Sequence, residues 1–298
     1  MKQHFARPPK RSELNEQVAL ELVRQHAAND LSGLQSPVMI RPFASPAGAH
    51  LLIGGAAGTG KTIALHTWAY RLLLQGVRVV YIEAHRADYE QPFQSALATL
   101  AAARGYSVQT HSLASCIPER WDPEDALTVY GAASKDGWDT ARYVMLLLSQ
   151  IDKYLKTESN SWGRLPLIVI VDGLEHNLEL VASGLEMAMA GWPAQNAYVW
   201  LSERSPWQLV RSNVPALRAL WTYSAILALI GRQEREFVPW LRAVGCFPSG
   251  VLTENRPQAA VCSAGLAEGI VWGTLALDEH ESALAMPYGA PEAMQLQQ

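Results

Sequence analysis

A glycine-rich run in this chain carries residues that can bind phosphate. Residues 54–62 read Gly-Gly-Ala-Ala-Gly-Thr-Gly-Lys-Thr and fit the pattern G-x-x-x-x-G-K-[ST]. Glycines let such a loop bend tightly, so several backbone N–H groups point at one anion. The lysine supplies charge for the β- and γ-phosphates, and the threonine hydroxyl can ligate Mg²⁺. The run predicts a triphosphate site, and the alternative is a chance glycine-rich turn. The predicted binding residues are Gly55, Ala57, Gly58, Thr59, Gly60, Lys61 and Thr62.

The flanking sequence favours the phosphate-binding interpretation. An apolar stretch over 50–54 predicts a strand that leads into the loop, and the pattern over 60–75 predicts a helix behind it. The positive end of that helix adds to the attraction for an anion. Strand, loop and helix therefore occur in the order that the motif requires.

A second acidic element lies downstream. The run Leu-Ile-Val-Ile-Val over 167–171 is typical of a strand buried on both faces of a parallel sheet, and it ends in Asp172. A carboxylate at the end of such a strand can hold Mg²⁺ beside the hydroxyl of Thr62, as a Walker B element does. The alternative is that Asp172 caps the helix that follows.

Two glutamates are candidates for the general base that orients the attacking water. Many motors place Glu directly after the Walker B aspartate, but that position holds Gly173 here. Glu175 lies two residues further on, where it would otherwise stabilise a helix dipole. Glu83 ends the second predicted strand, where it would otherwise be a strand-edge charge. The missing glutamate predicts slow ATP hydrolysis, or hydrolysis only in an assembled state.

A third polar element ends the predicted strand over 197–201. Ser202 or Glu203 could sense the γ-phosphate there, and Arg204 could contact phosphate or a neighbouring subunit. The alternative is a strand-to-loop exit with solvated charges. Further candidates for an arginine finger are Arg211, Arg218, Arg232 and Arg235.

The elements around these residues alternate between strand and helix. Such alternation implies right-handed crossovers and a mostly parallel sheet flanked by helices. Further strands are predicted at 38–40, 77–82 and 107–110, and helices at 88–103, 138–156, 177–190 and 233–244. Residues 113–137 contain prolines and glycines and are predicted to form irregular structure. The spacing of Val18, Leu22 and Val23 predicts a surface helix over 12–28. We therefore predict an N-terminal helical appendage (1–36), an ATPase domain (37–286) and a loose tail (287–298).

Composition narrows the function classes. Of the 298 residues, 49% are hydrophobic and 17% charged, enough apolar sequence for a sizeable core. The net charge of −4 argues against a basic surface that coats nucleic acid non-specifically. No stretch has a signal-peptide pattern or the length of a membrane span. Three widely spaced cysteines form no zinc pattern, so we expect a cytoplasmic protein, with peripheral association with the inner membrane as an alternative.

These motifs together resemble the FtsK/HerA-type P-loop motors, most closely the ATPases of conjugation and type IV secretion. The segments that carry the resemblance are HLLIGGAAGTGKT (50–62), VVYIE (79–83), ADYE (87–90), RWDP (120–123), LPLIVIVD (165–172) and WLSER (200–204). The resemblance implies a RecA-like fold, ATP and Mg²⁺ as ligands, a hexameric ring, and DNA or secretion-system proteins as partners. Ser202 and Glu203 fall where the family has threonine and the sensor glutamine.

A neighbouring resemblance offers a second interpretation. The run Val-Tyr-Ile-Glu over 80–83, after a P-loop helix, is similar to recombinase- and circadian-clock-type ATPases, which explains why no glutamate follows Asp172. Gly173 and Glu203 also leave open a nucleotide-gated scaffold module with weak hydrolysis. Both interpretations keep a RecA-like core.

Overall fold

The computed structural model describes most of the predicted core. The described residues are 17–26, 35–43, 49–84, 95–113, 125–131, 137–157, 165–174, 177–230, 258–263, 270–275 and 277–285, with Gln233, Phe237 and Pro239. Glu175, Arg232, Arg235, the tail over 287–298 and nearly all of the helix predicted over 233–244 lie outside them. None of the described helices has the length and apolar composition needed to cross a membrane.

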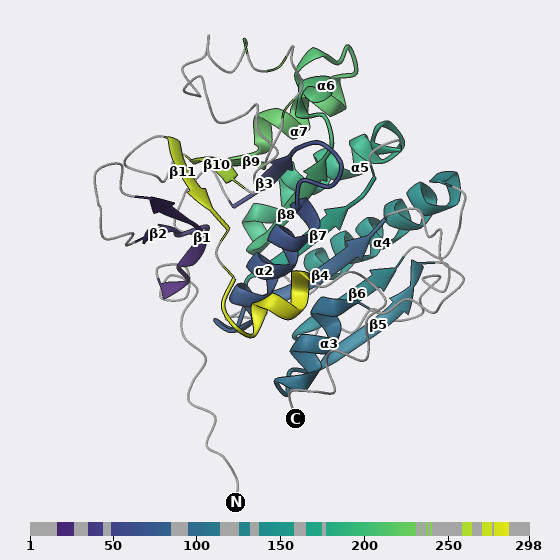
Figure 1. Cartoon of the computed structure of the whole chain (residues 1–298). Coiled ribbons are helices and arrows are strands. Elements are labelled where there is room, and N and C mark those ends of the chain that lie inside the picture. The colour runs from purple at the N-terminus through teal and green to yellow at the C-terminus, as the bar shows by residue number, and fades with distance from the viewer. Residues whose placement is uncertain are drawn as a thin grey trace, which may run out of the picture.

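Seven parallel strands form the centre of the molecule (Figure 1). Their order across the sheet is β9-β3-β8-β7-β4-β6-β5, and each pairs in parallel with its neighbours. Their bounds are β3 Leu51–Gly54, β4 Arg78–Glu83, β5 Val108–Ser112, β6 Leu127–Gly131, β7 Leu167–Asp172, β8 Ala197–Glu203 and β9 Ile226–Ile230. The predicted α/β fold with a mostly parallel sheet is therefore confirmed.

Four antiparallel strands extend this sheet beyond β9. They follow in the order β10, β11, β1 and β2, so the sheet has eleven strands. Their bounds are β1 Leu20–His26, β2 Gln35–Ile40, β10 Gln258–Ser263 and β11 Ile270–Thr274. The helix predicted over 12–28 is wrong, because its described part is largely β1. The proposed boundary at 36/37 falls within β2, and the division into domains stays a prediction.

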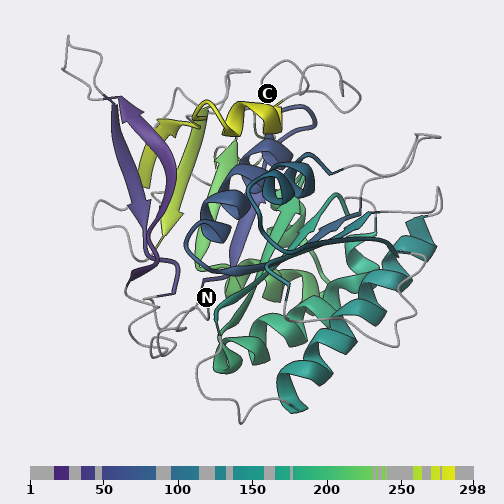
Figure 2. The same ribbon diagram turned by 90° about the horizontal axis from the view of Figure 1, so that it is seen from below.

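Helices cover both faces of the sheet (Figure 2). One face packs against α2 (Lys61–Leu73), α3 (Ala96–Ala103) and the short 3-10 helix η4 (Glu281–Ala285). The other face packs against α4 (Gly137–Thr157), α5 (Leu178–Gly191) and α7 (Pro215–Tyr223). Two shorter helices, η2 (Trp192–Gln195) and α6 (Pro206–Arg211), complete the described elements.

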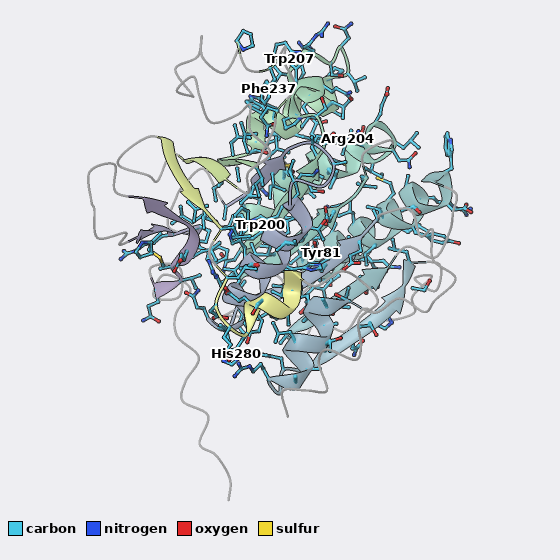
Figure 3. The ribbon with its side chains drawn as sticks, viewed as in Figure 1. Tyr81, Trp200, Arg204, Trp207, Phe237 and His280 are labelled. Atoms are coloured by element: carbon cyan, nitrogen blue, oxygen red, sulfur yellow. The ribbon has the colours of Figure 1, made fainter. Side chains whose placement is uncertain are left out.

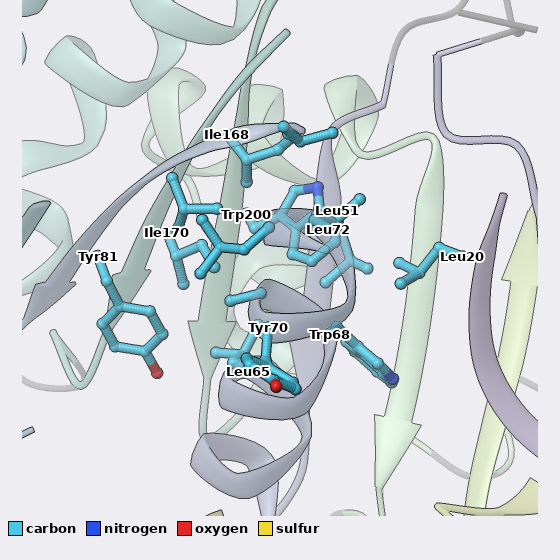
Figure 4. Packing of buried hydrophobic residues seen from close by; sticks show 14 of the residues in the cluster. Leu20, Leu51, Leu65, Trp68, Tyr70, Leu72, Tyr81, Ile168, Ile170 and Trp200 are labelled. Atoms are coloured by element: carbon cyan, nitrogen blue, oxygen red, sulfur yellow. The ribbon is translucent and has the colours of Figure 1, made fainter. Parts of the chain in front are cut away.

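The alternation of side chains along the strands decides which residues can meet α2. On β7, Ile168 and Ile170 belong to the core on the α2 side, whereas Val169 and Val171 belong to the opposite core (Figure 4). The same two-residue period puts the strand-end residues Glu83, Asp172 and Ser202 on the α2 side. It puts Glu203 on the opposite side.

Most predicted elements are confirmed, and β6 was missed in addition to β1. The strands at 50–54, 77–82, 167–171 and 197–201 correspond to β3, β4, β7 and β8, and the helix at 60–75 corresponds to α2. The region over 113–137, predicted to be irregular, contains β6, which is buried throughout and pairs with β4 and β5.

Candidate nucleotide-binding site

The glycine-rich loop joins β3 to α2, as the sequence predicts. Gly58 (φ 74°) and Gly60 (φ 95°) have left-handed backbone, which side chains other than glycine rarely adopt. Gly55 is required for space, since a Cβ there would lie 2.2 Å from the backbone oxygen of Ile230. Gln233 supports the loop from behind by donating to the backbone oxygens of Gly54 (3.4 Å) and Ile230 (3.3 Å).

Lys61 holds its ammonium group against the same loop. It is the first residue of α2, and Nζ donates to the backbone oxygens of Gly55 at 2.6 Å and Ala56 at 3.1 Å. The side chain is therefore curled over the loop that the motif assigns to phosphate. A cation in this place, at a helix N-terminus, favours an anionic ligand.

Asp172 lies beside Thr62, so the two predicted halves of the site meet. Thr62 Oγ1 donates to Asp172 Oδ2 at 2.8 Å, and the Tyr81 hydroxyl donates to the same oxygen at 3.0 Å. Ser202 Oγ donates to Asp172 Oδ1 and accepts from the backbone N–H of Gly173 at 3.1 Å. Adjacent hydroxyl and carboxylate oxygens are donors that Mg²⁺ prefers, so these residues fit the predicted ion.

Of the candidate bases, Glu83 lies near Asp172. The two residues are partners in the β4–β7 register, and their side chains share the α2 side of the sheet. Glu83 Oε1 lies 3.3 Å from His66 Nε2, and both side chains are buried. The structure thus brings together Lys61, Thr62, Asp172 and Glu83, whereas Glu175 lies outside the described residues.

Glu203 contacts the glycine-rich loop with its backbone, and its side chain lies on the other side of the sheet. Its backbone oxygen accepts from the N–H of Gly55 at 3.3 Å. Its Oε1 accepts from the N–H of Ser205 at 3.0 Å, at the start of α6, on the side of the sheet away from α2. Ser202, one residue earlier, reaches Asp172 instead, so the strand period separates these two sensor candidates.

The described candidate arginines follow β8 and are exposed. Arg204 lies between β8 and α6 (Figure 3), and the guanidinium of Arg211 lies 5.7 Å from the centre of the Trp207 ring. Arg218 lies on α7. Exposure leaves each of them accessible to another molecule.

Sequence reasoning missed Tyr81, His66 and Gln233. A signal existed for the first two. Tyr81 precedes Glu83 by two residues and so shares its face of β4, and His66 follows Thr62 by one helical turn on α2. Gln233 had no such signal, because it lies outside every strand that carries a motif.

No protein-family model and no curated protein matches the sequence. The solved structures that resemble it in fold include the two that follow. The cytoplasmic domain of the type VII secretion ATPase EccC of Thermomonospora curvata has a TM-score of 0.55 and 14% identity, and the match covers 91% of this chain and 29% of that one. VirB4 of Thermoanaerobacter pseudethanolicus has a TM-score of 0.63 and 8% identity, covering 88% of this chain and 97% of that one.

These matches agree with a parallel sheet flanked by helices. The chain spans under a third of the EccC domain but nearly the full length of VirB4. We conclude that the chain has the RecA-like α/β fold of P-loop ATPases, and that its structural neighbours are ATPases of the FtsK/HerA type, as the sequence resemblance predicts.

Proposed function

We propose that this chain binds Mg²⁺–ATP at the β3–α2 loop and hydrolyses it. The contact between Thr62 Oγ1 and Asp172 Oδ2, 2.8 Å long, supports this most directly. It joins two motifs that are 110 residues apart in the sequence and that have one common use, the binding of a metal–triphosphate complex. Lys61 adds the positive charge that such a ligand needs.

Each residue of the site has a role in this proposal. Lys61 moves from the loop carbonyls to the β- and γ-phosphates, and the backbone of 55–62 surrounds them. Thr62 and Asp172 hold Mg²⁺, which supplies charge neutralisation at the phosphates. Glu83 orients the attacking water and accepts its proton. Catalysis of this kind needs positioning and charge rather than a covalent intermediate.

We further propose that the ATPase is a motor of the DNA-translocase or type IV secretion and conjugation type, acting as a hexameric ring. The order of the motifs and the fold similarity to EccC and VirB4 support this class. Its partners would be DNA or secretion-system proteins, met in the cytoplasm or at the inner membrane surface. In a ring, one of the exposed arginines that follow β8 (Arg204, Arg211 or Arg218) would extend from one subunit to the nucleotide bound by its neighbour.

A second candidate is a RecA- or KaiC-like ATPase, or a nucleotide-gated scaffold with weak hydrolysis. Gly173 favours it, because the residue after Asp172 has no carboxylate and has a left-handed φ of 89°. A Gly173→Glu variant would be strained by about 1–2 kcal/mol, so restoring the usual glutamate is a poor test. Glu83→Gln is the better one. Loss of turnover with ATP binding retained identifies Glu83 as the base, whereas undetectable wild-type turnover favours the scaffold.

The test of the nucleotide site compares two lysines. We expect Lys61→Ala to weaken ATP binding at least tenfold, because the charge at the loop is lost while the fold is kept. Lys156→Ala on α4 removes an exposed charge that pairs only with Asp152 in the described structure, and should leave binding unchanged. Calorimetric titration with Mg²⁺–ATP measures both. Equal affinity in Lys61→Ala and the wild type would contradict the proposal.

The motor class is tested by size and stimulation. We expect the protein to assemble on addition of Mg²⁺–ATP, and its turnover to rise with single- or double-stranded DNA if DNA is the substrate. Analytical ultracentrifugation with and without ATP, and a turnover assay with and without each DNA, measure these. A protein that stays monomeric and is not stimulated by DNA would contradict the DNA-motor class and leave the nucleotide site standing.

A further inference from the structure

The carboxylate of Glu83 is held in a buried place by the helix that begins at the phosphate-binding loop. Its side chain is 6% exposed, so it cannot rely on water for its hydrogen bonds. His66 Nε2 lies 3.3 Å from Glu83 Oε1, and the His66 side chain is 2% exposed. Because a carboxylate can only accept at this contact, we assign the proton to Nε2 of the imidazole.

His66 is itself fixed by the residues that hold the metal ligands. It follows Thr62 by four residues on α2, so both side chains lie on the helix face turned toward the strand ends. Its ring packs against the ring of Tyr81, with the centroids 4.8 Å apart. The Tyr81 hydroxyl donates to Asp172, so one tyrosine orients the imidazole and also contacts the Walker B carboxylate.

We propose that His66 is a positioning residue for hydrolysis, which holds Glu83 in the orientation that the attacking water needs. This inference rests on the proposed ATPase function and on Glu83 as the base. In the step it serves, the water oxygen bonds to the γ-phosphorus, and the bond from that phosphorus to the β–γ bridging oxygen breaks. ADP leaves with the electron pair, and the water proton passes to Glu83 and then to solvent.

The place of His66 on α2 links its contact with Glu83 to the binding of the nucleotide. His66 is on the same helix as Lys61 and Thr62, and that helix begins at the loop that contacts phosphate. A shift of α2 on nucleotide binding therefore moves the residue that holds the base. Misplacement of a catalytic group by about 1 Å can cost about 100-fold in rate, so loss of this hydrogen bond should reduce turnover rather than ATP affinity.

The test uses two substitutions of His66 in the full chain. His66→Leu removes the donor, and we expect kcat to fall at least tenfold while the affinity for Mg²⁺–ATP changes less than twofold. His66→Gln keeps a donor near the position of Nε2 and should restore kcat to within about threefold of the wild type. His111→Leu is the matched control, since His111 is a partly buried histidine of β5, stacked on Tyr130 away from the site.

Coupling to Glu83 separates positioning from simple packing. In a Glu83→Gln background, His66→Leu should cause no further loss of kcat, because the two residues act on one step. Independent, multiplicative losses would overturn the proposal, as would an unchanged kcat in His66→Leu. If His66→Leu unfolds, as its melting temperature reports, the decision passes to His66→Gln, which must then retain kcat while Glu83→Gln does not.

The experiment also distinguishes a failure of the proposed ATPase function from a failure of the role proposed for His66. If wild-type turnover equals that of Lys61→Ala, the ATPase proposal fails and the role of His66 fails with it. If the wild type turns over normally and His66→Leu matches it, only the positioning role is wrong.

Discussion

Asp172 accepts hydrogen bonds from the hydroxyl groups of Thr62, Tyr81 and Ser202 although the residue has no exposed surface. A buried carboxylate is costly unless hydrogen bonds satisfy it. The three hydroxyl donors help to meet that need. A carboxylate beside the hydroxyl of Thr62, at the glycine-rich loop, fits a metal ligand better than a purely structural helix cap.

The first prediction concerns the neutral analogue Asp172→Asn. The amide keeps the size and much of the hydrogen bonding of the side chain, but it loses the charge that attracts Mg²⁺. We expect Mg²⁺ to strengthen ATP binding to the wild type at least tenfold more than it does to the variant. Titrations with Mg²⁺ and with a chelator measure the ratio. A variant that keeps the full effect of Mg²⁺ would show that Asp172 is not a metal ligand.

His50 shows a buried group whose role is structural. Its Nε2 contacts the backbone oxygen of Met189 at 2.8 Å, and its Nδ1 accepts from the N–H of Val199 at 2.9 Å. Both contacts are satisfied by the neutral ring with its proton on Nε2. Burial lowers the pKa of His50 from 6.5 to about 4, although the hydrogen bond to the backbone oxygen of Met189 acts in the opposite direction.

The second prediction is therefore a loss of stability in mild acid. Between pH 6.5 and 4 the unfolded chain binds a proton at His50 more readily than the folded chain does. His50 thus lowers the free energy of unfolding as the pH falls through this range, by roughly 3 kcal/mol in full. We expect His50→Gln to be less stable at pH 7.5 but to lose stability less steeply down to pH 5. Urea unfolding at several pH values measures this, and parallel curves would contradict it.

The motif residues could be predicted from the sequence, and their mutual geometry only in part. Lys61 and Thr62 sit in one continuous motif, and Asp172 ends a strand whose apolar run is unmistakable. The exclusion of Glu203 from the α2 side depends on the period along β8, which the sequence pattern could have revealed. The contacts of Tyr81 and His66 depend on how β4 packs against α2. This tertiary packing cannot be predicted from the local sequence pattern of either element.

At the scale of elements, α2 holds β1 and η4 in place, and it also carries the site residues Lys61 and Thr62. Arg71 Nε and Nη2 donate to the two carboxylate oxygens of Glu281 at 2.6 and 2.7 Å, and Nη1 donates to the backbone oxygen of Glu21 at 2.7 Å. Trp68 Nε1 donates to the backbone oxygen of Leu22 at 3.0 Å. One helix thus holds β1 from the N-terminal region and η4 from the C-terminal region.

The third prediction compares this ion pair with an exposed one. Glu281 is 2% exposed, so Glu281→Gln removes the closer of two described carboxylates from the largely buried Arg71 and leaves Glu21, whose Oε1 lies 4.0 Å from Nη1. We expect a loss of about 3 kcal/mol in the free energy of unfolding. Lys156→Ala breaks an exposed pair with Asp152 and should cost at most about 0.5 kcal/mol. Urea unfolding measures both free energies, and equal losses would show that the buried Glu281 contact stabilises the fold no more than the exposed pair does.

The elements that the sequence predicted poorly are those whose partners lie far along the chain. Val18, Leu20 and Leu22 alternate as a strand requires, but the spacing of Val18, Leu22 and Val23 also fits a helix. Pairing with β2 and β11 decides for the strand β1. β6 was hidden because its five residues stand in a region rich in turn-forming residues, although Thr128 and Val129 are β-branched.

At the scale of the whole molecule, the order of the strands was more predictable in the parallel half of the sheet than in the antiparallel half, of which only the strand at 38–40 was predicted above. Alternating strands and helices specify the order of a RecA-like core through right-handed crossovers. β10 and β11 carry no such pattern, and they join β9 on one side and β1 on the other. The sheet thereby brings the first and last described strands, β1 and β11, side by side.

The fourth prediction tests whether subunits share a site, as a ring requires. Arg204, Arg211 and Arg218 are exposed, so each is accessible to a neighbouring subunit. We expect the alanine variant of at least one of them to lose turnover at least tenfold while it keeps ATP affinity. Turnover assays and titrations of the three variants identify that arginine.

Mixing that variant with Lys61→Ala then distinguishes a contribution between subunits from one within a subunit. The arginine variant supplies intact phosphate-binding loops, and the Lys61→Ala subunit supplies intact arginines, so a shared site regains both at some of the mixed interfaces. We expect equimolar mixing to raise turnover several-fold above the mean of the two separate variants. A mixture that gives only that mean, in samples shown by sedimentation to contain mixed assemblies, would place the arginine on the same subunit as the loop. The rings would then serve another purpose than completing the catalytic site.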